Sequence, residues 1–199
     1  MKNKKISRMV QLAVLLGTVI FLQCFLGSIV VGTTSFSVVL VPIVIGAILL
    51  GPGAGVLLGF AFGAVVLIRG IGGQDFFTNM LFVAQPVFTA LICLGKGMAA
   101  GFLAGLSYQM ISKVNAFWAS VAAAAIAPIA NTGLFILGGL TLVRGTLEAN
   151  LSTFGADSVL IFLVLGCAGV NFIVEFGVNM LLSPAIYRII TVVKKTFFK

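Results

Sequence analysis

The chain has 199 residues, of which 61% are hydrophobic and only 8% are charged, against about 25% charged residues in ordinary soluble domains. Its net charge is +8, and it contains no histidine. This composition excludes a soluble domain, and the lack of histidine excludes a Ser-His-Asp triad and any metal site that needs a histidine ligand. Apolar stretches of about 20 residues form membrane-spanning helices, whereas barrel strands alternate over about 10 residues. We therefore expect an all-α integral membrane protein with one membrane domain over residues 1–199, built as a six-helix bundle.

The first half of the chain predicts three spans. Residues 9–31 follow a lysine-rich start and lack a small-x-small cleavage site, so we interpret them as an uncleaved span and not as a signal peptide. The next apolar stretch is interrupted by "GPGAG" at residues 51–55. Because clusters of glycine and proline end helices, this stretch is predicted to form a helical hairpin of residues 36–50 and 53–69.

The second half predicts three further spans and two polar loops. Residues 69–79 form the first loop. The segment 80–95 is apolar but contains Gln85 and Pro86, and it is predicted to cap the bundle or to enter the membrane without crossing it. The remaining spans are expected at residues 97–112, 116–143 and 158–190, with the second loop at 144–157.

The basic residues at both ends of the chain predict its orientation. Lysine and arginine are enriched on the cytoplasmic side of membrane proteins, so both termini are expected in the cytoplasm. Two cytoplasmic termini require an even number of spans, which favours six over seven, and the two polar loops then face outside. Since topology explains the basic residues, no nucleic-acid partner is expected.

Glycines recur every four residues in two of the predicted spans. The two series are Gly51, Gly55, Gly59 and Gly63, and Gly97, Gly101 and Gly105. Small residues at this spacing let helix backbones approach closely in lipid, so we interpret both series as internal helix packing. Ala13 and Gly17 form another such pair in the first span, where the alternative is contact with a second membrane subunit.

Several polar side chains lie inside the predicted spans. Asn131 and Thr132 fall mid-span, while Asn171, Glu175 and Asn179 are spaced four apart and share one helix face. A carboxylate inside the membrane is costly, and such residues mark functional sites by default. We predict a ligand site formed by Asn131, Thr132, Asn171 and Glu175, with Asn179 as a packing residue. The alternative is hydrogen bonding that only holds the helices together.

Other chemistries lack their motifs. The sequence has no CxxC, Ser-x-x-Lys or Gly-x-Ser-x-Gly motif, and "GPGAG" is not followed by the Lys-Ser/Thr of a phosphate-binding loop. We therefore expect neither an enzyme nor a bound cofactor or metal. The chain by itself is also not expected to drive transport with ATP.

Stretches along nearly the whole chain show a familiar order of features. They are "SRMVQLAVLLG", "VPIVIGAILLGPGAGVLLGFAFG", "GKGMAAGFLAGLSYQMI", "IANTGLFILGG" and "NFIVEFGVNMLLSPAI". Together they resemble the six helices of the substrate-binding S components of energy-coupling factor (ECF) vitamin transporters. Two departures stand out: the first-helix motif ends in Gly17 where the family usually has alanine, and "LGKG" places Lys96 where many relatives carry Pro-Arg.

The resemblance implies a protein of the bacterial cytoplasmic membrane that captures a vitamin from outside. Such a subunit has no ATPase of its own, and it works with a transmembrane T scaffold and two ATPase subunits. By position, Ala13 and Gly17 would contact the T scaffold. The family's pocket, built from outer loops and the last three helices, matches the predicted site, to which Gln85, Lys96 and Arg144 are added as polar candidates.

The resemblance makes pantothenate the first candidate ligand. Because pantothenate is an anion, Lys96, Arg69 or Arg144 would have to supply a positive charge. Glu175 would repel an anion unless the carboxyl is paired, is protonated or binds donor groups of the ligand, so riboflavin or another vitamin is the alternative. A self-sufficient secondary transporter or channel, and a purely structural or assembly protein, are the competing functions. The first of these would typically show an inverted repeat, and the break at "GPG" has no clear partner in the second half.

Overall fold

The computed structural model describes residues 4–25, 30–31, 34–35 and 38–197. These residues are almost entirely helical, as expected for an all-α membrane protein. Five of the described helices are long and apolar enough to cross a membrane, which gives the chain the character of a multi-pass membrane protein. Parts of the first two predicted spans, residues 26–29 and 36–37, lie outside the described residues.

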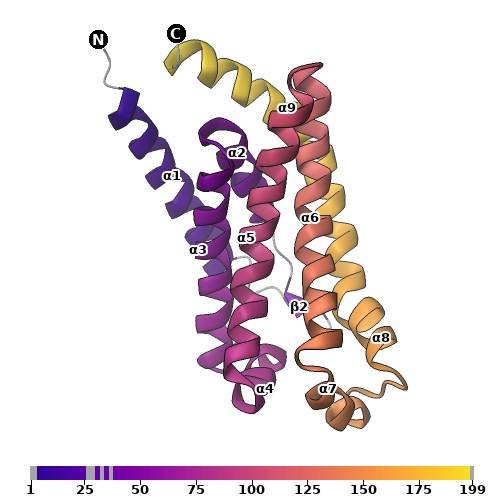
Figure 1. Cartoon of the computed structure of the whole chain (residues 1–199). Helices are drawn as coiled ribbons and strands as arrows, with labels where there is room; N and C mark the ends of the chain where they lie inside the picture. Colours follow the sequence, from indigo (N-terminus) through magenta and orange to yellow (C-terminus); the bar gives the residue numbers. More distant parts are fainter. Residues whose placement is uncertain (1–3, 26–29, 32–33, 36–37, 198–199) are drawn as a thin grey trace.

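Figure 1 shows a bundle of long helices with both chain ends at one end, which we call the terminus end. The opposite end carries α4 and α7, and we call it the loop end. The helices are α1 (Lys4–Phe25), α2 (Leu40–Leu50), α3 (Pro52–Ile71), α4 (Phe76–Ala84), α5 (Pro86–Ile111), α6 (Ala116–Thr141), α7 (Arg144–Asn150), the 3-10 helix η2 (Leu151–Phe154), α8 (Val159–Ile161), the π-helical η3 (Phe162–Gly169) and α9 (Val170–Phe197).

The end of the first predicted span is not helical. β1 (Val30–Val31) pairs antiparallel with β2 (Thr34–Ser35), so the prediction that the first helix reaches residue 31 is wrong. Valine and threonine favour extended backbone, and α1 ends at Phe25.

The helical hairpin turns at a single residue. α2 ends at Leu50, and Gly51 has a φ of 101°, a conformation that favours glycine. Pro52 then occupies the first turn of α3, where its missing N–H costs nothing and its fixed φ suits a helix. The Gly-Pro pair therefore both ends α2 and starts α3.

The structure corrects the start of the fourth predicted span. α4 ends at Ala84, and α5 runs without a break from Pro86 to Ile111, so residues 86–95 are the first turns of a long helix and not a separate capping segment. Pro86 marks a helix start, because proline is tolerated in the first helical turn. The carbonyl of Gln85 accepts the first hydrogen bond from the backbone N–H of Thr89.

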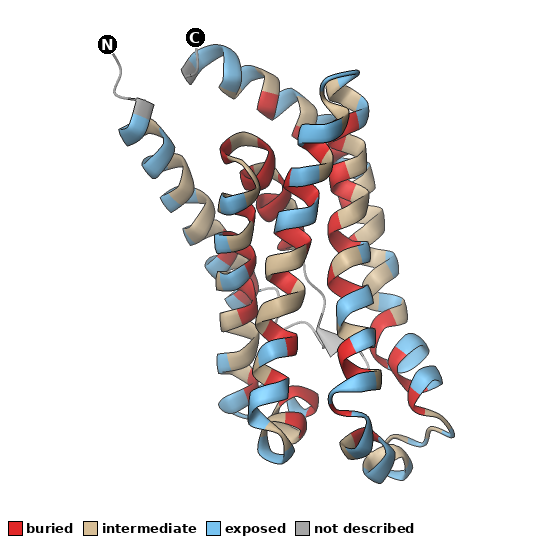
Figure 2. Ribbon diagram, in the orientation of Figure 1, coloured by how far each residue is buried: buried red, intermediate tan, exposed pale blue. Residues whose placement is uncertain are grey.

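Apart from Gly51, which forms the turn, the glycines of the two series pack α3 directly against α5, which confirms their interpretation as internal packing sites. A Cβ on Gly59 would collide with the backbone of Gly97, and one on Gly55 would collide with the backbone of Gly101. Gly63 faces the α5 backbone in the same way. Figure 2 shows buried residues concentrated where the central helices face one another, whereas α1 is largely exposed towards the terminus end.

Candidate functional site

Glu175 on α9 lies in the interior of the bundle, and its side chain is 1% exposed. Asn131 on α6 is also buried, and its Nδ2 donates a hydrogen bond of 3.4 Å to Oε2 of Glu175. Asn171, one helical turn before Glu175, lies within side-chain hydrogen-bonding range of the same carboxyl group. The structure therefore brings together three of the residues predicted from the sequence.

Lys96 on α5 adds a positive charge to this group. Its Nζ lies 5.2 Å from the ring centre of Phe135 and 5.9 Å from that of Phe62, so two aromatic faces surround the ammonium. Lys96 also interacts electrostatically with Glu175. Lys96 and Glu175 do not approach within the 4.0 Å of an ion pair. Among the described residues, Arg144 and Glu148 on α7 form the pair that meets this distance. We call Glu175, Lys96, Asn131 and Asn171 the Glu175 cluster.

The two asparagines leave acceptors without partners. The Nδ2 of Asn131 faces the carboxyl group, and its Oδ1 is buried without a hydrogen-bond partner among the described residues. Oδ1 of Asn171 is also buried and has no hydrogen-bond partner among the described residues. Buried polar atoms are normally hydrogen-bonded, so these two carbonyl oxygens lack the N–H or O–H partners that buried acceptors usually have.

A cavity of about 30 Å³ adjoins the cluster through Lys96. Its wall is formed by α4, α5, α6, α7 and η3, and it is mostly apolar and aromatic. The volume is about that of one water molecule in the liquid, whereas ligand sites measure roughly 300–1,000 Å³. The cavity must therefore widen before it can hold a vitamin. A second hollow of about 240 Å³ opens between α5 and α6, and Lys96 lines it as well.

Aromatic rings gather around Phe77, which lines the cavity. Phe77 on α4 lies with its ring centre 6.0 Å from Phe135, 6.2 Å from Phe154 and 5.8 Å from Phe162. Phe154 and Phe162 stack at 4.6 Å.

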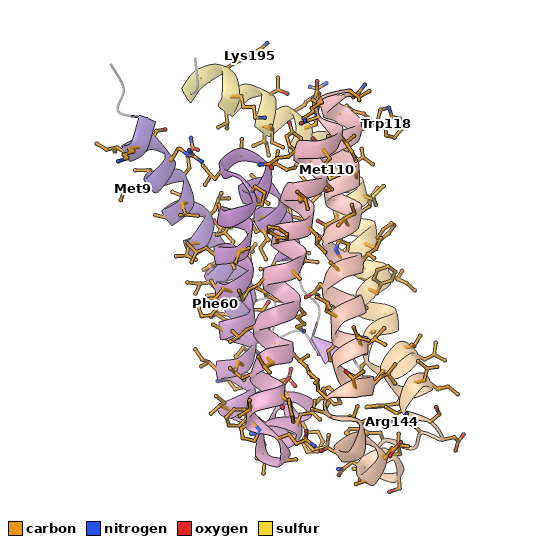
Figure 3. The ribbon with its side chains drawn as sticks, viewed as in Figure 1. Met9, Phe60, Met110, Trp118, Arg144 and Lys195 are labelled. Carbon is orange, nitrogen blue, oxygen red and sulfur yellow. The ribbon has the colours of Figure 1, made fainter. Side chains whose placement is uncertain are left out.

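Two predicted site residues lie at the loop end, outside the cluster. Arg144 is exposed at the loop end (Figure 3), and its Nε donates to Oε1 of Glu148 at 2.7 Å. Gln85 joins α4 to α5, and its Nε2 donates to Oγ1 of Thr146 on α7 over 3.0 Å. Both lie at the loop end and not in the Glu175 cluster, and Oε1 of Gln85 is buried without a hydrogen-bond partner among the described residues.

Of the remaining polar candidates, one lies beside the cluster and two donate hydrogen bonds to backbone carbonyl groups. Thr132 is buried next to Asn131 on α6. Asn179 donates to the backbone carbonyl of Glu175 over 2.8 Å, which fits its predicted packing role. Arg69 donates to the backbone carbonyls of Gln23 and Cys24 and so ties α3 to α1. Of the three cations considered for an anionic ligand, Lys96 is the one that lines the cavity.

Sequence reasoning missed the two aromatic faces around Lys96. Phe62 and Phe135 stand in apolar helices among 18 phenylalanines, and nothing in their spacing separates them from ordinary core residues. A hydrogen-bonding and ligand-binding role suits the assembled group. Among the described residues, no group of three or more His, Cys, Asp and Glu could hold a metal ion.

Ala13 and Gly17 lie on the exposed side of α1. A Cβ on Gly17 would have no neighbour within 4 Å. Met9 and Val14 beside them are 70% and 64% exposed, and Figure 3 shows Met9 at the end of α1 that stands away from the bundle. The pair therefore belongs to an apolar face that no described helix covers.

Comparison with protein-family models, with curated proteins and with solved structures finds no match to this chain.

Proposed function

We propose that the chain is the substrate-binding S component of an ECF-type importer in a bacterial cytoplasmic membrane. The observation that carries the proposal is the Glu175 cluster, a group of polar and charged side chains in the interior of a membrane protein and next to a cavity. Intramembrane ionisable groups of this kind mark ligand or ion sites. The sequence likeness adds the family, with pantothenate as its first candidate ligand and riboflavin as the alternative.

Six spans with cytoplasmic termini fit the arrangement of the helices. The short helix α2 supplies the sixth span beside the five long ones. Both termini lie at the same end (Figure 1), in keeping with an even number of crossings. Lys195 and Trp118 also lie at that end (Figure 3). Lysine is enriched on the cytoplasmic side of a membrane, and tryptophan is enriched at both membrane surfaces.

The exposed face of α1 is the proposed contact with the T scaffold. Small residues at Ala13 and Gly17 allow a partner helix to approach closely. The face is separate from the Glu175 cluster, so binding of the ligand and coupling to the ATPases can be disturbed independently.

Replacing Gly17 by leucine, or Ala13 by leucine, should abolish uptake when the chain is co-expressed with T and ATPase subunits. The isolated variants should bind ligand as the wild type does, since the substitutions lie on the exposed face of α1. Gly133→Leu is the matched control, because Gly133 is exposed on α6 and a Cβ there also meets nothing within 4 Å. Radiolabelled vitamin uptake by cells and binding by purified protein are the two measurements.

Unchanged uptake in both α1 variants would reject this face as the coupling surface. Uptake by the purified chain alone in liposomes, without T and ATPase subunits, would reject the S-component proposal in favour of a secondary transporter or channel.

A further inference from the structure

The ammonium group of Lys96 lacks a hydrogen-bond acceptor among the described residues. The ammonium lies over the rings of Phe62 and Phe135, and it interacts at longer range with the carboxyl group of Glu175. An ammonium carries three donors and no acceptor, and leaving such donors unpaired in an apolar region is costly. A ligand group with a carbonyl oxygen or ring nitrogen would satisfy them.

The cluster also has unused acceptors. Because Asn131 and Asn171 turn their nitrogen atoms towards Glu175, their Oδ1 atoms are left buried and unpaired. N–H or hydroxyl groups on the ligand would fill these positions. This hydrogen-bonding pattern therefore suits a ligand that carries both hydrogen-bond acceptors and donors.

When Glu175 is ionised, the charges of the cluster balance before any ligand binds. Glu175 then contributes one negative charge and Lys96 one positive charge, with Glu175 buried and Lys96 partly buried among apolar helices. A net charge added to this interior would remain uncompensated, which costs much more than it would in water. An anion would be attracted by Lys96 and repelled by Glu175. A cation would be attracted by Glu175 and repelled by Lys96.

The wall of the adjoining cavity favours ligands with aromatic rings. Its wall contains Phe77 and Phe135 together with apolar side chains from α5, α6 and η3, and Lys96 is the charged residue in it. Flat aromatic groups pack well against phenylalanine faces.

From these observations we infer that the ligand is an electrically neutral heteroaromatic compound with an acceptor for Lys96 and N–H or O–H donors for Asn131 and Asn171. This inference depends on the proposed function, because it assumes that the cluster binds the transported compound. It favours compounds of the riboflavin type over the anion pantothenate and over cations such as thiamine.

The test measures binding of a vitamin panel to the purified full chain by isothermal titration calorimetry. Riboflavin, pyridoxine and nicotinamide represent neutral rings, pantothenate and biotin represent anions, and thiamine represents a cation. We expect a neutral ring to bind best. Lys96→Met should weaken that ligand about tenfold or more, the effect of losing a hydrogen bond to a charged group. Glu175→Gln should shift the preference towards anions, because the positive charge of Lys96 is then unbalanced.

Lys113→Met and Glu148→Gln are the matched controls, since both residues are exposed and lie outside the cluster. Thermal unfolding of each variant checks that it is folded, and Lys96→Arg, which keeps the charge, should retain the preference for neutral ligands. Tightest binding of an anion or cation by the wild type would overturn the inference while leaving the S-component proposal intact. Binding of no neutral member would also overturn it, as would an order of affinities that neither cluster variant changes.

Discussion

Gly59→Ala is expected to destabilise the protein strongly, although it adds a single methyl group. The new Cβ would collide with the carbonyl group of Gly97, and backbone atoms cannot move aside as the end of a side chain can. Overpacking in a core costs about 1–3 kcal/mol and sometimes more, and here α3 and α5 would have to separate. The measurement is the thermal unfolding midpoint in detergent, together with the yield of monodisperse protein.

Gly133→Ala provides the control for that substitution. Gly133 is also a helical glycine, but it is exposed on α6 and has open space around the position of a Cβ. Alanine favours a helix by about 1 kcal/mol over glycine, so this variant should be as stable as the wild type or more so. Equal midpoints for Gly59→Ala and Gly133→Ala would contradict the close packing of α3 on α5.

Lys96→Met is expected to be the most damaging single change in the Glu175 cluster. It leaves the buried carboxyl group of Glu175 without the positive charge near it, and an uncompensated buried charge is destabilising. Glu175→Gln in the same chain should restore part of the loss, because the amide no longer needs a counter-charge. Coupling between groups in one network is about 0.5–3 kcal/mol, and thermal unfolding of the wild type, both single variants and the double variant measures it.

Additive effects of the two substitutions would show that the two charges do not interact. Lys113→Met serves as the control, since Lys113 is exposed beyond the end of α5 and its loss should leave the midpoint unchanged.

Local sequence patterns predicted much of the fold. The Gly-Pro pair indicated the turn at Gly51, because both residues act on their own backbone. The four-residue glycine spacing indicated close helix packing, although only the structure shows that Gly59 faces Gly97. The spacing of Asn171 and Glu175 placed them on one helix face, and their polarity inside an apolar helix made them visible as a site.

Long-range features could not be predicted in the same way. Pro86 was taken for an interruption, since a proline that breaks a helix and one that starts a helix look alike in sequence. The pairing of Arg144 with Glu148, one turn away, depends on a short helix that the sequence showed only as a loop. The approach of Lys96 to Glu175 depends on how α5 and α9 pack, which no local pattern specifies.

The most direct test of the central claim is ligand binding by the isolated chain. Native mass spectrometry of the purified protein against the vitamin panel should detect one bound small molecule per chain without T or ATPase subunits. Glu175→Gln and Asn171→Ala should change the affinity or the choice of that ligand, because both side chains belong to the proposed site. No bound vitamin, or unaltered binding of every ligand by both variants, would contradict the account of the Glu175 cluster as the substrate site.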